Sequence, residues 1–223
     1  MARLARVVVP DLPHHVTQRG NRRQAVFFRP ADYQTYRTLL GHWCRYYRVQ
    51  VWAYCLMTNH VHLILVPQTE AGLRQALGEA HRRYTRLINF REGWRGHLWQ
   101  GRFASFVLDE PYLLAAARYV ELNPVHARLV VDPATYPWSS AAAHLRGEDD
   151  GLVTVRPLLE LVPAWRTLLA SGLPQAEIPQ LERHERTGRP LGSAAFVAGL
   201  EQRLARALLP RKPGPKPRSR RGN

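Results

Sequence analysis

The sequence predicts an α+β protein with a ferredoxin-like plan, in which an antiparallel sheet has helices packed on one face. Three observations support this class. The predicted elements follow the order strand–helix–strand–strand–helix–strand–helix, the strands are short and rich in β-branched and aromatic residues, and 45% of the residues are hydrophobic, as in ordinary globular domains. At 223 residues the chain can build one full core with an extension, or two small domains.

The first half of the chain supplies most of the predicted sheet. A strand over 5–18 is broken by Pro10 and Pro13, and a basic turn over 19–23 follows it. Residues 31–47 have apolar side chains at helical spacing. Two apolar, β-branched runs over 49–57 and 60–66 flank a turn at 58–59 and predict a pair of strands.

The second half predicts two further helices around one strand. A basic amphipathic helix fits 70–89, and a strand fits 104–108. The next helix is expected over 111–122, ending before Pro124, because a residue that precedes proline avoids the α region. We therefore divide the chain into a domain over 1–147, a mostly helical extension over 148–209 and a basic, Pro/Gly-rich tail over 210–223, which we expect to be disordered in isolation.

Charge and composition limit the classes of partner. The formal net charge of +15 favours polyanions, either nucleic acid or an anionic membrane. There is no apolar run of about 18 residues to span a bilayer, and the apolar stretch near the N-terminus is too short for a signal peptide. Cys44 and Cys55 are expected to be free thiols. We expect a cytoplasmic protein that binds nucleic acid and no membrane.

The sharpest local pattern is His60-Val61-His62. Alternate side chains of a strand share a face, so the two imidazoles point the same way, about 7 Å apart along the strand, and can converge on one cation. Two ordinary histidines on a half-exposed strand would give the same pattern, so the pair needs a third element.

Tyr119 and Asn123 offer that element. They are four residues apart, so both project from one face of the predicted helix near its end. A phenol beside a divalent cation and arginines becomes a better nucleophile, and the amide oxygen of Asn123 suits a hard cation such as Mg²⁺ or Mn²⁺. A core tyrosine with a helix-ending asparagine remains the alternative interpretation.

These residue types suit attack on a phosphodiester. Arginines can meet phosphates, and Trp94, Trp99 and Phe103 can stack on unpaired bases, although solvated arginines and core aromatics would look the same. The residues predicted to contact DNA are Arg19, Asn21, Arg22, Arg23, Arg82, Arg83, Trp99, Gln100 and Arg102.

Five ordered motifs over residues 5–145 resemble the single-tyrosine HUH transposases, and most closely their REP-associated branch. The motifs are HHVTQRGNRRQ (14–24), LMTNHVHL (56–63), LWQGRF (98–103), RYVELNPV (118–125) and YPWSS (136–140). The resemblance implies that 1–147 is a catalytic domain that cleaves and joins single-stranded or hairpin DNA with Mg²⁺ or Mn²⁺. It places the nucleophile at Tyr119 and the metal ligands at His60, His62 and Asn123, and it leaves a monomer or a homodimer open.

Three other classes compete with this interpretation. Replication initiators and plasmid relaxases share the HUH pair, but they commonly carry a third histidine close to it and often a second tyrosine beside the first, and neither occurs next to these motifs. A DNA-binding regulator that has lost catalysis is the alternative from a non-enzyme class. A ribonuclease has no need of a tyrosine nucleophile, because RNA carries its own 2′-hydroxyl.

Overall fold

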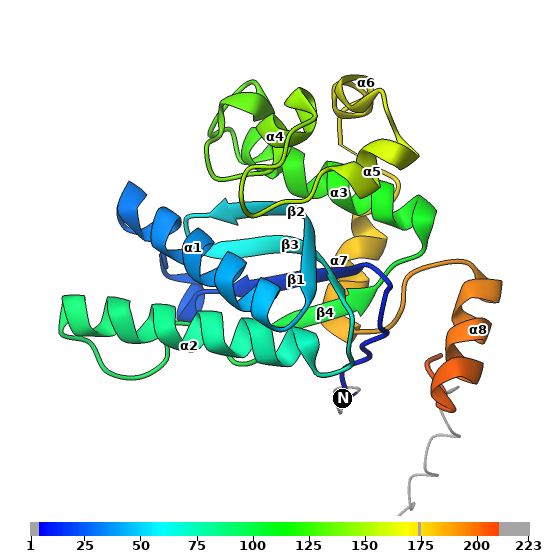
Figure 1. Ribbon diagram of the computed structural model, residues 1–223, viewed down its shortest axis with the longest axis horizontal. Helices are drawn as coiled ribbons and strands as arrows, with labels where there is room; N and C mark the ends of the chain where they lie inside the picture. Colours follow the sequence, from blue (N-terminus) through cyan, green and yellow to red (C-terminus); the bar gives the residue numbers. More distant parts are fainter. Residues whose placement is uncertain (1–4, 174, 210–223) are drawn as a thin grey trace, which may run out of the picture.

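The computed structural model describes residues 5–173 and 175–209, and the predicted tail over 210–223 lies outside them. Four antiparallel strands form one sheet in the order β2-β3-β1-β4 (Figure 1). The strands are β1 (His14–Arg19), β2 (Val49–Met57), β3 (His60–Pro67) and β4 (Ala104–Val107). The predicted α+β class with an antiparallel sheet is confirmed.

Helices cover both faces of this sheet, where the sequence led us to expect one covered face. α1 (Pro30–Tyr46) and α2 (Gly72–Glu92) pack together on one face, and α3 (Glu110–His126) packs on the other, mainly against β2 (Figure 1). The reason lies in α3, whose Leu113, Ala116 and Val120 form an apolar stripe that must be buried. Phe106 and Ile64 supply the matching apolar surface on that second face.

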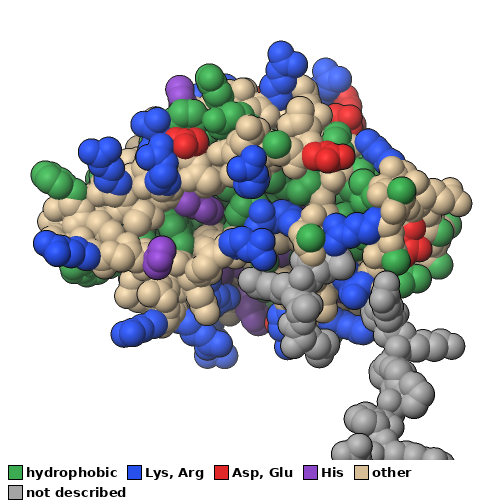
Figure 2. Space-filling model, turned by 90° about the horizontal axis from the view of Figure 1, so that it is seen from below, with side chains coloured by type: hydrophobic (Ala, Val, Ile, Leu, Met, Phe, Trp, Pro, Cys, Tyr) green, Lys and Arg blue, Asp and Glu red, His purple; other side chains and the backbone are tan. Residues whose placement is uncertain are grey.

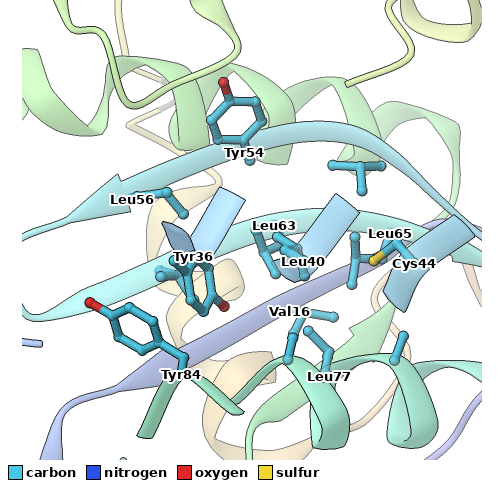
Figure 3. Packing of buried hydrophobic residues seen from close by; sticks show 14 of the residues in the cluster. Val16, Tyr36, Leu40, Cys44, Tyr54, Leu56, Leu63, Leu65, Leu77 and Tyr84 are labelled. Atoms are coloured by element: carbon cyan, nitrogen blue, oxygen red, sulfur yellow. The ribbon is translucent and has the colours of Figure 1, made fainter. Parts of the chain in front are cut away.

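The main core lies between the sheet and the pair α1 and α2. Figure 3 shows Tyr36 and Leu40 of α1 and Leu77 of α2 facing Leu63 and Leu65 of β3, and all five are fully buried. Each such side chain contributes about 1.5–3 kcal/mol on burial. This layer fixes β3 from one side and leaves His60 and His62 on the other side, next to the apolar Ile64.

The chain before β1 differs from the predicted strand over 5–18, because only His14–Arg19 is paired. Pro10 and Pro13 lack the N–H that a sheet ladder needs, and Asp11 has a positive φ of 64°. Val7 and Val9 instead pack against α8 (Ala194–Leu204), at the far end of the extension. This contact attaches the last described helix to the start of the chain.

α3 continues through Pro124, so the predicted end before this proline is wrong. Proline removes only its own hydrogen bond to the preceding turn, while the N–H groups of Ala127 and Leu129 donate to the carbonyls of Asn123 and Pro124, both at 2.9 Å. Pro124 is also buried, so packing offsets the lost bond. Asn123 therefore lies inside the helix.

The extension is mostly helical, as expected, and returns to the sheet. Its short helices after α4 (Ala141–Arg146) are α5 (Arg156–Leu161), α6 (Trp165–Ala170) and α7 (Ile178–Thr187). α6 contacts α3, and α7 contacts β4 and β1 on the side opposite α1 and α2 (Figure 1). None of the helices in the described ranges has both the length and the apolar character to cross a membrane.

Candidate active site

The two histidines of β3 lie on the face of the sheet that α3 covers. Val61, Leu63 and Leu65 enter the core under α1 and α2, so the alternation of the strand turns His60 and His62 to the opposite side. Their ring centroids are 4.9 Å apart, with the rings nearly perpendicular. His62 is buried and His60 is half-buried.

α3 brings the tyrosine to the same place. The ring centroid of Tyr119 lies 5.5 Å from that of His62, and the side chain of Asn123 hydrogen-bonds Tyr119. The structure thus brings together the four residues His60, His62, Tyr119 and Asn123 that the sequence singled out, from two elements almost 60 positions apart.

The ring nitrogens of both histidines fit a metal centre. Nδ1 of His60 lies 2.6 Å from Oδ1 of Asn59, and Nδ1 of His62 lies 3.1 Å from Nε2 of His15. Each Nδ1 therefore has a protein partner, which leaves Nε2 as the nitrogen for an ion, the arrangement usual for metal-bound histidines. Within residues 5–173 and 175–209 no three side chains of the His, Cys, Asp or Glu type gather into a metal-binding group. The side chains that would hold an ion here are the two imidazoles and, as predicted from the sequence, Asn123.

The imidazoles are kept neutral, as metal ligands must be. Burial lowers the pKa of His60 to about 4, with a smaller contribution from the charge of Arg19. Burial also holds the pKa of His62 well below 6.5, and the nearby His60, His15 and Arg19 act in the same direction. Both rings can therefore offer a lone pair at neutral pH.

The phenol of Tyr119 has a raised pKa. Burial is the main cause, and the charges of Glu185 and Glu182 on α7 add to it, whereas Arg19 and the hydrogen bond from Asn123 oppose it. A cation beside the histidines would act in the same direction as Arg19 and favour the phenolate.

Two residues of the site were not predicted. His15 of β1 stacks on His62, with ring centroids 5.3 Å apart, so a third histidine does lie next to the pair in space. Glu185 of α7 is half-buried, and Oγ1 of Thr17 donates a hydrogen bond of 2.9 Å to its carboxylate. Thr17 lies directly opposite His62 in the sheet. The motif containing His15 could be read from the sequence, but no pattern near Glu185 points to the site.

The predicted DNA contacts divide into two groups. The turn over 19–23 and Gln100 lie beside the site, because the N–H of Gly20 donates to the carbonyl of Asn59 and the N–H of Gln100 to that of Arg19, both at 2.8 Å. A Cβ on Gly20 would lie 2.2 Å from the carbonyl oxygen of Gln24, so this turn requires glycine. In this turn Arg22 and Arg23 are exposed, and Asn21 is half-buried.

The second group lies along α2. Arg82, Trp99 and Arg102 line a cavity of about 480 Å³ between α2 and the segment 97–103. Trp99 is only 6% exposed and packs in the main core, so its ring is not free to stack on a base. Arg83 lies over the ring of Trp43, outside this cavity. Figure 2 shows basic side chains spread over this side of the molecule, with few acidic ones among them.

Comparison with known proteins identifies the family of the chain. Residues 8–123, just over half of the chain, match the family described as IS200-like transposases. No curated protein matches the chain. A solved structure of a REP-associated tyrosine transposase bound to a REP hairpin is 19% identical and covers 70% of this chain and 90% of its own, with a TM-score of 0.57.

A second solved structure, of a candidate transposase from Deinococcus radiodurans, is 20% identical and covers 54% of this chain and 96% of its own, with a TM-score of 0.39. The family match includes both strands of the site, the histidine pair, Tyr119 and Asn123. The chain therefore belongs to the IS200-like transposase family, whose members are DNA-cleaving enzymes.

Proposed function

We propose that this protein cleaves and rejoins single-stranded, hairpin-forming DNA through a covalent bond to Tyr119, with Mg²⁺ or Mn²⁺ held by His60, His62 and Asn123. The observation that carries the proposal is the 5.5 Å separation of the Tyr119 and His62 rings on one face of the sheet. A nucleophile and a metal-ligating pair must meet in this way for phosphoryl transfer.

The reaction follows from the residues at the site. The phenol oxygen of Tyr119 attacks the phosphorus, the bond from phosphorus to the 3′ oxygen breaks, and the products are a 5′-phosphotyrosine and a free 3′-hydroxyl. The bound ion would neutralise charge on the non-bridging oxygens and orient the phosphate. The new phosphodiester keeps roughly the energy of the old one, so attack by a 3′-hydroxyl rejoins the strand without ATP.

The substrate class rests on charge and on likeness. The turn over 19–23 lies at the end of β1 that pairs with His60, so its arginines are placed to meet phosphates beside the reacting one. The basic side chains of the described residues are all arginine, which can grip phosphate with two parallel hydrogen bonds. The structure similar to this chain holds a REP hairpin, and we propose a hairpin of that kind here.

The proposal is tested with a labelled hairpin oligonucleotide carrying a single-stranded flank and Mn²⁺, analysed on a denaturing gel. The wild-type protein should give a retarded covalent species that Tyr119→Phe does not form. His60→Ala should also abolish cleavage while hairpin binding stays largely intact. Binding by the wild-type protein without any covalent product would favour a regulator without catalysis.

A further inference from the structure

His15 is the neighbour of the metal-ligating pair that the proposed reaction leaves without a role. It lies on β1, and its ring is nearly parallel to that of His62, with an interplanar angle of 14°. Phe106 meets the same ring edge-on at 5.2 Å, and Tyr119 lies edge-on at 6.4 Å. The ring of His15 is thus held by the rings of His62, Tyr119 and Phe106.

The contact between the two histidines carries a single proton. Nε2 of His15 and Nδ1 of His62 are 3.1 Å apart, and in a neutral pair only one of these nitrogens can be the donor. If His62 donates from Nδ1, its Nε2 carries a lone pair and can bind an ion. If His15 donates instead, Nε2 of His62 holds the proton and is blocked. The partner of Nδ1 therefore decides whether His62 can serve as a ligand.

Because both rings are buried, the hydrogen-bond partner of Nδ1 of His62 is His15 and not water. His15 is 1% exposed and His62 is 2% exposed, so water has little access to replace the contact. Nδ1 of His15 is buried with no hydrogen-bond partner. A polar ring kept in such a place at a cost in stability points to a role beyond packing, because an apolar side chain would fill the space without the unpaired group.

We propose that His15 is a positioning residue of the catalytic site, which accepts the Nδ1 proton of His62 and so holds the His62 ring with Nε2 available to the metal. This inference rests on the proposed metal site at His60 and His62. His15 itself touches neither substrate nor ion in this role. Asn59 has the same function for His60, so each ligand has its own acceptor.

The test compares Mn²⁺ affinity, measured by isothermal titration calorimetry without DNA, in three variants. His15→Phe keeps an aromatic ring against Phe106 but removes the acceptor, and it should weaken Mn²⁺ binding about 10–100-fold. His15→Gln restores an acceptor oxygen and should recover most of that loss. His14→Gln is the matched control: its neighbouring ring bonds the backbone of Val9 and Leu12 instead, and its Mn²⁺ affinity should not change.

A second measurement does not depend on the variants folding. In the wild-type protein with Mg²⁺ and ¹⁵N-labelled histidine, NMR should find the proton of His62 on Nδ1. A proton on Nε2, or unchanged Mn²⁺ affinity in a folded His15→Phe, would overturn the inference. His60→Ala separates the two proposals: if this variant binds Mn²⁺ as the wild type does, the metal site itself is wrong. If it loses binding while His15→Phe keeps it, only the role of His15 fails.

Discussion

Glu185 shows how much a single side chain from the extension can contribute to the site. Among the hydrogen bonds of the described residues, Glu185 is the one acidic side chain that bonds a side chain of β1. That side chain is Thr17, which lies opposite His62 in the sheet. Burial raises the pKa of its carboxyl, whereas Thr17 and Arg19 lower it. The proposed ligands are all neutral, so a nearby negative charge would help to attract a divalent cation.

We therefore predict that Glu185→Gln weakens Mn²⁺ binding about tenfold, the lower end of the usual effect of residues around a metal site. Calorimetric titration of the protein without DNA measures the change. Glu160→Gln on α5 is the control, because Glu160 is also in the extension but is exposed and paired with Arg156. Equal affinities in Glu185→Gln and the wild type would show that the extension does not act on the ion.

Residues that a local pattern reveals were predictable, and those that depend on strand pairing were not. His60 and His62 followed from the two-residue period of a strand, and Tyr119 and Asn123 from the helical spacing of four. His15 is 47 positions from His62, and only the register of β1 against β3 brings them together. Glu185 depends on the path of a whole extension, on which the sequence carries no local signal.

At the scale of elements, α3 is held in place by a buried network around Glu121. The carboxylate accepts hydrogen bonds from Ser140, His144 and Trp165, at 2.5, 2.6 and 2.8 Å, and all four residues are almost fully buried. These partners belong to α4, the residue before it, and α6. The network therefore ties α3 to the extension at a position two residues after Tyr119.

Glu121→Ala should destabilise the protein by about 3–5 kcal/mol, because it leaves buried donors without an acceptor. Urea unfolding followed by circular dichroism measures this loss. Glu110→Ala, at the exposed start of the same helix, is the comparison and should change the free energy of unfolding by less than about 0.5 kcal/mol. A small effect at Glu121 would mean that the network does not hold α3.

The elements were more predictable than their arrangement. The helix over 31–47 and the strand over 49–57 agree with α1 and β2 to within one residue, because their apolar periodicity is strong. The errors came from tertiary packing, which carried α3 past Pro124 and placed it on the second face of the sheet. The division at 147 remains a prediction, although α3 contacts α6 across it.

For the molecule as a whole, buried histidines make stability depend on pH. Burial lowers the pKa of His14 to about 4 and that of His81 to about 3, both from the usual 6.5. Between these values the unfolded chain binds protons that the folded chain does not, so the free energy of unfolding falls as the pH falls below about 6.5.

We expect each of these two histidines to cost about 1.4 kcal/mol of stability between pH 7.5 and pH 5.5. Urea unfolding at the two pH values, without metal, measures the loss for the whole chain, to which His15, His60 and His62 also contribute because burial lowers their pKa values as well. In His81→Gln, which removes one of these histidines, the loss of stability should be smaller by about 1.4 kcal/mol. A stability that stays constant down to pH 5.5 would contradict the burial of these rings.

Within one chain, α3 places Tyr119 beside His62 of its own sheet, with ring centroids 5.5 Å apart. A mixture of His60→Ala and Tyr119→Phe proteins should therefore remain inactive on the hairpin substrate, as measured by the covalent species on a gel. Recovery of cleavage in the mixture would show that two copies exchange the tyrosine helix. The monomer or homodimer remains a prediction, and the test with mixed variants is valid for either state.

The hairpin between β2 and β3 restricts insertions and deletions in this part of the chain. The turn at Thr58 and Asn59 is bonded on its outer side by the N–H groups of Gly20 and Val26, which fixes where β3 begins. One residue inserted after Asn59 would rotate every later side chain to the other face. The imidazoles would enter the layer of leucines, and the leucines would face the substrate. A substitution on β3 changes one side chain, whereas a change in the length of the strand exchanges its two faces.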